Sequence, residues 1–343
     1  MDKSLPSLQE WRGLYFEAIE FKNIKSWEWM FDSDLFGVQN PENSEIGYCC
    51  VLGNSGEFFG LAVYLGTKGL ESYLKIQSGQ VQPGDPDSLY IQDCLMASFE
   101  DRKFLQKEDL QIIKDLGLKF RGPNSWPIFR NYKPGYFPWF LNKNEIIYLT
   151  LVLQQTKEVC LRCKENKKVL YPPEKNYYLV RVPEVRKNTL IWKDEYLQPT
   201  SLKIEKISSE TWDEIRIQRI KRNIRQTNLI WEVDFFHAPT PIKKEDERPY
   251  FPYVFLFVDQ GSGFIFHAHV TKLTDYREEF QKSFLECIEK TGIMPIEIQV
   301  KKYEVFELLE PTSAKLNITI RLVDRLKSLE MARKGMIKFF KRG

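Results

Sequence analysis

The order of apolar segments after Leu229 constrains the fold of this chain more than any other feature. Three apolar runs follow one another, "LIWEVDFF", "YVFLFVDQ" and "GFIFHAHV", and the turn residues Asp259–Gly263 join the last two. The rest alternates between helical and strand patterns: "REEFQKSFLECIEKTG", "MPIEIQV", "YEVFELLEP", "LNITIRLV" and "DRLKSLEMARKGM". The predicted order is β-β-β-α-β-α-β-α, and right-handed crossovers would put the fourth and fifth strands beside the first in a five-stranded mixed sheet.

The residues before this region also mix helices and strands. Ser7 and Glu10 have the spacing of a capping box at the start of a helix, and "EIGYCCVLGNSGEFFGLAVYLG" predicts a hairpin that turns at Asn54-Ser55-Gly56. We expect a strand over 89–101, helices over 107–117 and 143–163, and strands over 176–184 and 188–199. The proline- and aromatic-rich stretch 126–145 is expected to be a loop.

Length and patterning together predict two domains. A chain of 343 residues is long enough for two separate cores. The segment 199–228 is polar and basic and lies between two strand-rich regions. We predict an α+β domain over 1–198, a basic connecting helix over 199–228 and a mixed α/β domain over 229–343.

Composition predicts an ordered protein in the cytoplasm with no membrane segment. Hydrophobic residues make up 43% of the chain, and the longest apolar run, Tyr253–Val258, is far shorter than the roughly 18 residues of a membrane span. We expect the six cysteines to be reduced thiols. The net charge of +3, from 50 basic and 47 acidic residues, neither requires nor excludes a nucleic-acid partner.

The region from Leu229 to Val323 resembles the ribonuclease-H-like catalytic cores of retroviral-type integrases and transposases. The resemblance lies in "WEVD", "FVDQGSGFIFHAHV" and "TGIMPIEIQV". It implies a ribonuclease-H-like fold, and in that family three carboxylates bind two divalent cations about 4 Å apart. Asp234 matches the first carboxylate and Glu330 could supply the third, but Lys301 and Lys302 stand where the second belongs. A lysine there repels a metal ion, so we expect neither a metal nor another cofactor.

The whole chain also resembles a pair of uncharacterised bacterial domains of unknown function that occur together. The stretches that carry this resemblance are "SWEWMFDSDLFGVQNPENSEIGYCCVLGNSGEFFGLAVYLG", "YKPGYFPWFLNKNE" and "RPYFPYVFLFVDQGSG". The resemblance implies a bacterial protein but no activity.

Two surfaces are candidates for partner contact. Arg216, Arg219, Arg222 and Arg225 recur every three residues and could neutralise successive phosphates, and the cationic end "RKGMIKFFKRG" could contribute; a solvated charged face is the alternative. The aromatic residues Tyr132, Tyr136, Phe137 and Trp139 could contact a protein partner; the alternative is that they fill a gap between the domains.

Cysteine and histidine spacing suggests two weaker sites. Cys160 and Cys163 could join Cys49 and Cys50 in a zinc site, or they could be incidental thiols at helical spacing. His267 and His269 alternate onto one face of a strand, but the sequence offers them no third ligand.

The sequence thus favours a non-catalytic binding or interaction protein built on a ribonuclease-H-like domain, with a protein or nucleic acid as partner. One alternative is a divalent-metal nuclease that uses Asp234, Glu330 and a third carboxylate the sequence does not identify. Another is a purely structural protein–protein interaction module.

Overall fold

A computed structural model describes residues 5–81, 86–187, 189–200, 214–243, 247–274 and 276–340 of the chain. The chain divides into two compact units, Met1–Pro134 with Pro138–Lys203, and Gly135–Phe137 with Ile204–Gly343. The domain limits 1–198, 199–228 and 229–343 stay a prediction, and residues 201–213 of the proposed connecting segment lie outside the described residues. Within the described ranges, every helix is too short or too polar to cross a membrane.

The first unit is built on a seven-stranded mixed sheet with the order β5-β4-β3-β2-β1-β6-β7. Its strands are β1 (Phe36–Gln39), β2 (Ile46–Leu52), β3 (Phe59–Leu65), β4 (Cys94–Glu100), β5 (Trp126–Tyr132), β6 (Tyr178–Arg186) and β7 (Thr189–Leu197). Its helices are α1 (Leu8–Ile24), α2 (Gly66–Gln77), α3 (Pro86–Ile91), α4 (Lys107–Asp115) and α5 (Lys143–Glu165). Neighbouring strands are antiparallel except β1 and β6, which are parallel.

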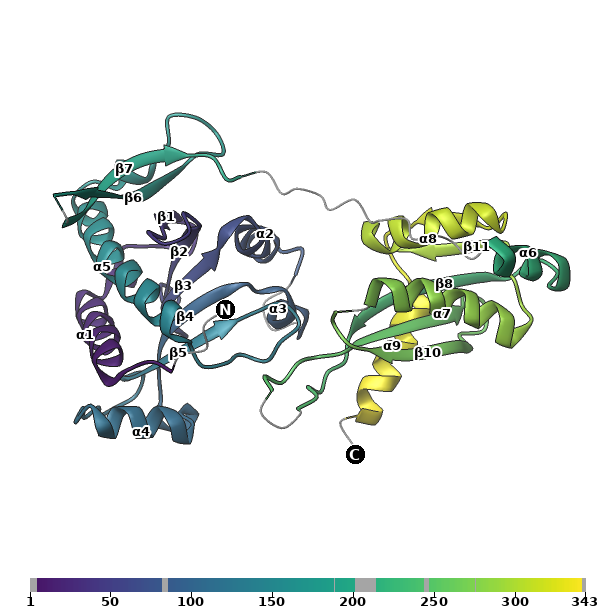
Figure 1. Cartoon of the computed structure of the whole chain (residues 1–343), viewed down its shortest axis with the longest axis horizontal. Helices are drawn as coiled ribbons and strands as arrows, with labels where there is room; N and C mark the ends of the chain where they lie inside the picture. Colours follow the sequence, from purple (N-terminus) through teal and green to yellow (C-terminus); the bar gives the residue numbers. More distant parts are fainter. Residues whose placement is uncertain are drawn as a thin grey trace. The chain divides into compact units, whose positions relative to one another are not determined.

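The two faces of this sheet carry separate cores. Helices α1 and α5 pack on one face through residues such as Leu14 and Leu149. Helix α2 lies on the other face, where Leu70 and Tyr73 are buried (Figure 1). The Ser7–Glu10 capping box is present, which confirms the predicted start of α1.

Two strands of the first unit were not predicted, because their local signals are weak. Strand β1 has only four residues. Strand β5 contains Pro127, which is tolerated because β5 lies at the edge of the sheet. The strand expected over 89–101 is wrong at its start, since α3 ends at Ile91 and β4 begins at Cys94.

The second unit has a five-stranded mixed sheet with the order β10-β9-β8-β11-β12. Its strands are β8 (Ile230–His237), β9 (Tyr253–Asp259), β10 (Ile265–Thr271), β11 (Glu297–Val300) and β12 (Thr319–Leu322). Its helices are α6 (Glu214–Asn223), α7 (Tyr276–Thr291), α8 (Tyr303–Lys315) and α9 (Lys327–Phe340). Strands β8, β9 and β10 pair antiparallel, whereas β8, β11 and β12 pair parallel.

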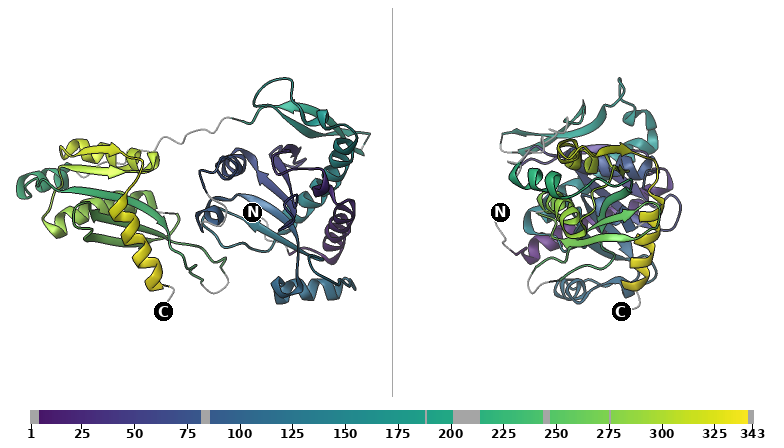
Figure 2. Two further views of the ribbon diagram at one scale, coloured as in Figure 1. Left: turned by 180° about the vertical axis from the view of Figure 1, so that it is seen from behind. Right: turned by 90° about the vertical axis from the view of Figure 1, so that its right-hand side faces the viewer.

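This topology confirms the predicted ribonuclease-H-like fold. In chain order the strands lie 3-2-1-4-5, with the fourth and fifth beside the first. Helices α6, α7 and α8 bury their apolar residues on one face of the sheet, and α9 buries Leu329 on the other. Helix α7 lies in front of the sheet in Figure 1, and α9 lies in front of it in the reverse view of Figure 2.

Candidate functional site

Asp234, the first carboxylate of the metal site considered from the sequence, lies in the central strand β8 of the second unit. Its side chain is buried, and Oδ1 accepts a hydrogen bond of 2.8 Å from the backbone N–H of Phe235. The ammonium Nζ of Lys302 lies 3.1 Å from the same oxygen. Nζ also donates to the carbonyl of Phe235 and lies 4.9 Å from the centre of the Phe235 ring. The carboxylate is therefore neutralised from within the protein.

The register of β11 explains why Lys302 reaches Asp234. Glu297 of β11 lies opposite Ile230 of β8, and Gln299 lies opposite Glu232. Asp234 follows Glu232 by two residues in β8. The chain just after Val300 therefore lies opposite Asp234. Lys302 immediately precedes α8 at this point. The strand register thus brings Lys302 beside Asp234.

Two further carboxylates of the second unit, Glu330 and Glu304, have their own partners. Glu330 is 2.9 Å from Nε of Arg325. Glu304 accepts from the hydroxyl of Tyr276 and lies 3.4 Å from Arg277. Within the described ranges, no three His, Cys, Asp or Glu side chains are grouped to hold a metal ion.

A second buried carboxylate, Glu232, escaped the sequence analysis. It is 2% exposed, and its Oε2 accepts a hydrogen bond of 2.7 Å from the N–H of Leu329 in the first turn of α9. Burial raises the pKa of Glu232. A signal was present, because a Glu two positions before Asp234 in an apolar strand shares its face. Glu232 anchors the start of α9 to the sheet.

The four arginines at and after α6 do not share one free face. Ile217 and Ile220 of α6 are buried in the core of the second unit. Arg216 forms two hydrogen bonds with Glu289, 3.0 and 2.7 Å long. Arg225 is exposed but follows the helix.

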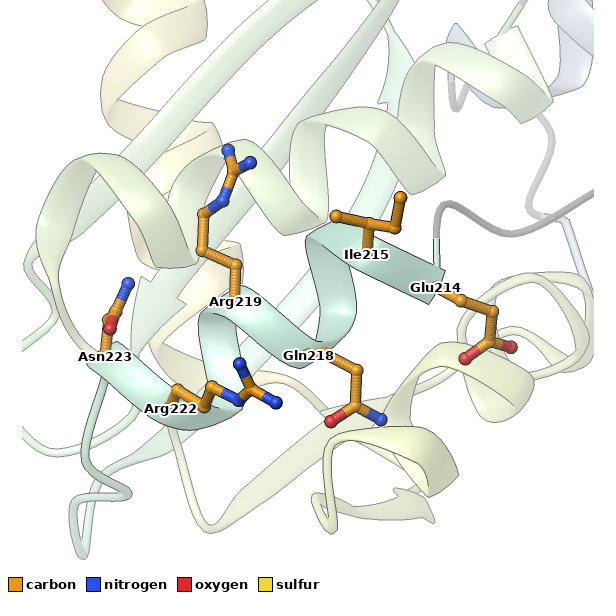
Figure 3. A pocket seen from close by; sticks show the side chains of 6 residues that line it. All are labelled: Glu214, Ile215, Gln218, Arg219, Arg222 and Asn223. Atoms are coloured by element: carbon orange, nitrogen blue, oxygen red, sulfur yellow. The ribbon is translucent and has the colours of Figure 1, made fainter.

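Arg219 and Arg222 are the exposed arginines on this helix, and Lys221 beside them is exposed as well. The two arginines line an open pocket of about 500 Å³. The lining residues are Glu214, Ile215, Gln218, Arg219, Arg222 and Asn223 (Figure 3). In the portion of the chain that the structure describes, neither guanidinium lies within ion-pair distance of a carboxylate. The C-terminal basic stretch is described only to residue 340, so its last three residues lie outside the described part.

The aromatic residues singled out for partner contact are half-buried inside their own units. Tyr132 packs against the core beside α2, and the backbone of Trp139 pairs with Asn131. Tyr136 and Phe137 belong to the second unit, where their rings contact those of Tyr250 and Phe251. A partner contact at these residues stays a prediction.

Adjacent cysteines cannot form the four-thiolate site. Cys49 is buried with Cys160 and Cys163 on the face of α5, whereas Cys50 is buried on the face of α2. Strand alternation causes this separation. Burial raises the pKa of the Cys163 thiol to about 11, so it stays protonated at neutral pH.

The predicted histidine pair lies side by side on β10. The parallel rings of His267 and His269 have centroids 6.2 Å apart, and Nε2 of His269 is 3.4 Å from Glu279 of α7. Both histidines therefore face α7.

Two family models match parts of this chain. Residues 11–181 match a "Domain of unknown function (DUF7309)", and residues 216–337 match a "Domain of unknown function (DUF6930)". The two matches follow one another along the chain. The DUF6930 match begins within α6, in keeping with the burial of Ile217 and Ile220 in the second unit. No curated protein matches the sequence.

Solved structures similar to this chain include retroviral integrases. The catalytic core of HTLV-2 integrase with magnesium, in its trimeric form, is 19% identical over 32% of this chain and 68% of its own, with a TM-score of 0.25. The core of BIV integrase is 14% identical over 33% and 68%, with a TM-score of 0.26. A simian T-cell lymphotropic virus intasome chain is 20% identical over 32% and 40%, with a TM-score of 0.25. The fold assignment of the DUF6930 domain rests on its strand order.

Proposed function

We propose that this protein acts by binding a nucleic acid and not by metal-dependent cleavage of one. The observation that carries the non-catalytic part is the contact of 3.1 Å between Lys302 and Asp234. A divalent ion about 4 Å from the ammonium would meet a repulsion on the order of 8 kcal/mol, twice the value for two unit charges near a protein surface. A nuclease would have to displace Lys302 before it could bind metal.

Arg219 and Arg222 support a nucleic acid as the ligand. Both are exposed on α6, which is itself anchored in the core of the DUF6930 domain by Ile217 and Ile220. Phosphate groups of a nucleic acid would pair with the two guanidinium groups, because Glu214, the carboxylate in the pocket lining, is paired with Lys315. Gln218 and Asn223 beside them add hydrogen-bonding groups for the same ligand.

The test is binding of labelled single- and double-stranded oligonucleotides as a function of salt. Replacing Arg219 and Arg222 together by Ala should weaken binding at least about tenfold and flatten its salt dependence by about two counterions. The matched control is the double variant Lys68→Ala with Lys75→Ala, which removes two exposed cations from α2 of the DUF7309 domain.

Two outcomes would contradict the proposal. One is equal loss of affinity in both double variants, which would mean that only total charge matters. The other is cleavage of the oligonucleotide in the presence of Mg²⁺ or Mn²⁺, because cleavage would support the nuclease alternative.

We also propose that the protein is located in the cytoplasm.

A further inference from the structure

Helical spacing defines the outward face of α6. Ile217 and Ile220 are buried in the core of the second unit. With about 3.6 residues per turn, the opposite side of the helix holds four exposed residues, Ile215, Gln218, Arg219 and Arg222. Figure 3 shows Ile215 and Arg219 directed to one side of this face, and Gln218 and Arg222 directed to the other. The face therefore presents two rows of side chains.

The described residues around α6 do not neutralise its exposed cations. Arg219, Lys221 and Arg222 form no ion pair or hydrogen bond with another residue in the described ranges. The carboxylates of α6 and of the last turns of α7 are already paired: Glu214 with Lys315, Glu286 with Lys290 and Glu289 with Arg216. The exposed side of α6 therefore keeps its positive charge for a ligand.

We propose that α6 enters the major groove of duplex DNA, an inference that rests on the nucleic-acid binding proposed above. The helix has 10 residues and is about 15 Å long, and the major groove of B-DNA is about 12 Å wide and admits an α-helix. Arginine side chains such as Arg219 and Arg222 donate to guanine there, and Gln218 can bond adenine. Ile215 is 74% exposed and can contact thymine methyl groups. Lys221, at the flank of this face, binds a phosphate.

The composition of α6 favours duplex DNA over single strands and over RNA. Its sequence, "EIRIQRIKRN", has no aromatic residue. Surfaces that bind single strands stack the bases on aromatic side chains. The major groove of an RNA duplex is too deep and narrow for side chains to read. Duplex DNA is therefore the nucleic acid that this face fits.

Three duplexes of one sequence test the groove. They are plain DNA, DNA in which every cytosine carries a glucosylated hydroxymethyl group, and RNA. The glucose fills the major groove but leaves the phosphate charges unchanged. The full chain should bind plain DNA at least about tenfold more tightly than either of the other duplexes.

The outcomes of this comparison separate the two proposals. Equal affinity for plain and glucosylated DNA would overturn the major-groove proposal while leaving phosphate binding by α6 intact. Affinity for none of the three duplexes would overturn the proposed nucleic-acid binding, and the major-groove proposal with it.

Two single variants separate base contact from phosphate contact. Gln218→Ala should weaken binding to plain DNA at least about fivefold and leave both the binding to glucosylated DNA and the salt dependence unchanged, because its amide contacts a base edge. Lys221→Ala should weaken binding to both DNAs by the same factor and reduce the salt dependence by about one counterion. The matched control is Gln9→Ala, which removes an exposed glutamine from α1 of the first unit. Gln218→Ala that binds plain DNA as tightly as Gln9→Ala does would overturn the proposal.

Discussion

Each unit holds a buried carboxylate next to a cation, and the two pairs differ in how the cation is held. In the first unit, Arg130 binds Asp109 through two hydrogen bonds of 2.6 and 2.8 Å, and both side chains are more than nine-tenths buried. In the second unit, Lys302 reaches Asp234 through one contact of 3.1 Å, and its side chain is 42% exposed. The first pair is fixed inside a core. The second pair lies near the end of a strand, where solvent reaches the lysine side chain.

The two pairs therefore differ in what they can do. A two-point pair in a core contributes to folding and offers no opening to a ligand. Lys302, which lies between β11 and α8, covers the carboxylate of Asp234 while solvent reaches its own side chain.

Breaking the buried pair of the first unit should have the largest effect. Arg130→Met leaves the Asp109 charge buried without its partner, which should lower the free energy of unfolding by about 3–5 kcal/mol. Urea unfolding followed by circular dichroism measures this. The control is Lys103→Met, which removes an exposed cation 3.8 Å from Asp101 and should change stability by less than about 1 kcal/mol. Equal losses of stability in Arg130→Met and Lys103→Met would show that the buried ion pair stabilises the protein no more than the exposed one does.

Removing Lys302 should cost less than removing Arg130. Lys302→Met takes one charged partner from Asp234, but the backbone N–H of Phe235 remains, and solvent can approach. We expect a loss of about 1–2 kcal/mol in the free energy of unfolding. The neighbouring exposed residue gives the control, because Lys301→Met should be close to neutral. A neutral Lys302→Met would mean that the ion pair does not stabilise the domain.

Glu232 should give the second domain a stability that falls as pH rises. Burial raises the pKa of Glu232 in the folded protein above its usual value of 4.5. Between 4.5 and the folded pKa, the folded state binds more protons than the unfolded state, so stability decreases with increasing pH through this window. Glu232→Gln should remove this slope, whereas exposed Glu307→Gln should keep it. The measurement is urea unfolding from pH 4 upward, and an unchanged slope in Glu232→Gln would exclude Glu232 as its source.

Replacing Arg216 should have the smallest effect of the four changes, and it should differ from replacing Arg222 on the same helix. Because Arg216 pairs with Glu289 on the partly exposed surface, Arg216→Ala should lower stability by about 0.5 kcal/mol. Its nucleic-acid affinity should stay near that of wild type, whereas Arg222→Ala alone should weaken binding. A larger loss of affinity in Arg216→Ala than in Arg222→Ala would show that the free cations on α6 are not the binding residues.

The sequence predicts the second fold well because its signals are local and consistent. Three apolar runs with a turn at Asp259–Gly263, followed by helix-linked strands, leave few topologies once crossovers are right-handed. Strand β5 was missed because Pro127 is a strand breaker unless it lies at an edge, and only tertiary structure tells which strand lies there.

The candidate site could be predicted only in part. The sequence places Lys301 and Lys302 where a second carboxylate belongs, but it does not tell which lysine turns toward Asp234. The role of Glu232 depends on contact with Leu329, which lies 97 residues further along the chain. The separation of Arg216 from Arg219 and Arg222 depends on Glu289 of a different helix. Such pairings follow from packing between distant segments.

Calorimetric titration of the full chain with Mn²⁺, in wild type and in Asp234→Ala, tests the central claim most directly. The Lys302–Asp234 contact predicts no stoichiometric binding to either protein, because the ammonium already neutralises the carboxylate. Stoichiometric binding to wild type that disappears in Asp234→Ala would contradict it, and would mean that Lys302 yields its place to a metal ion.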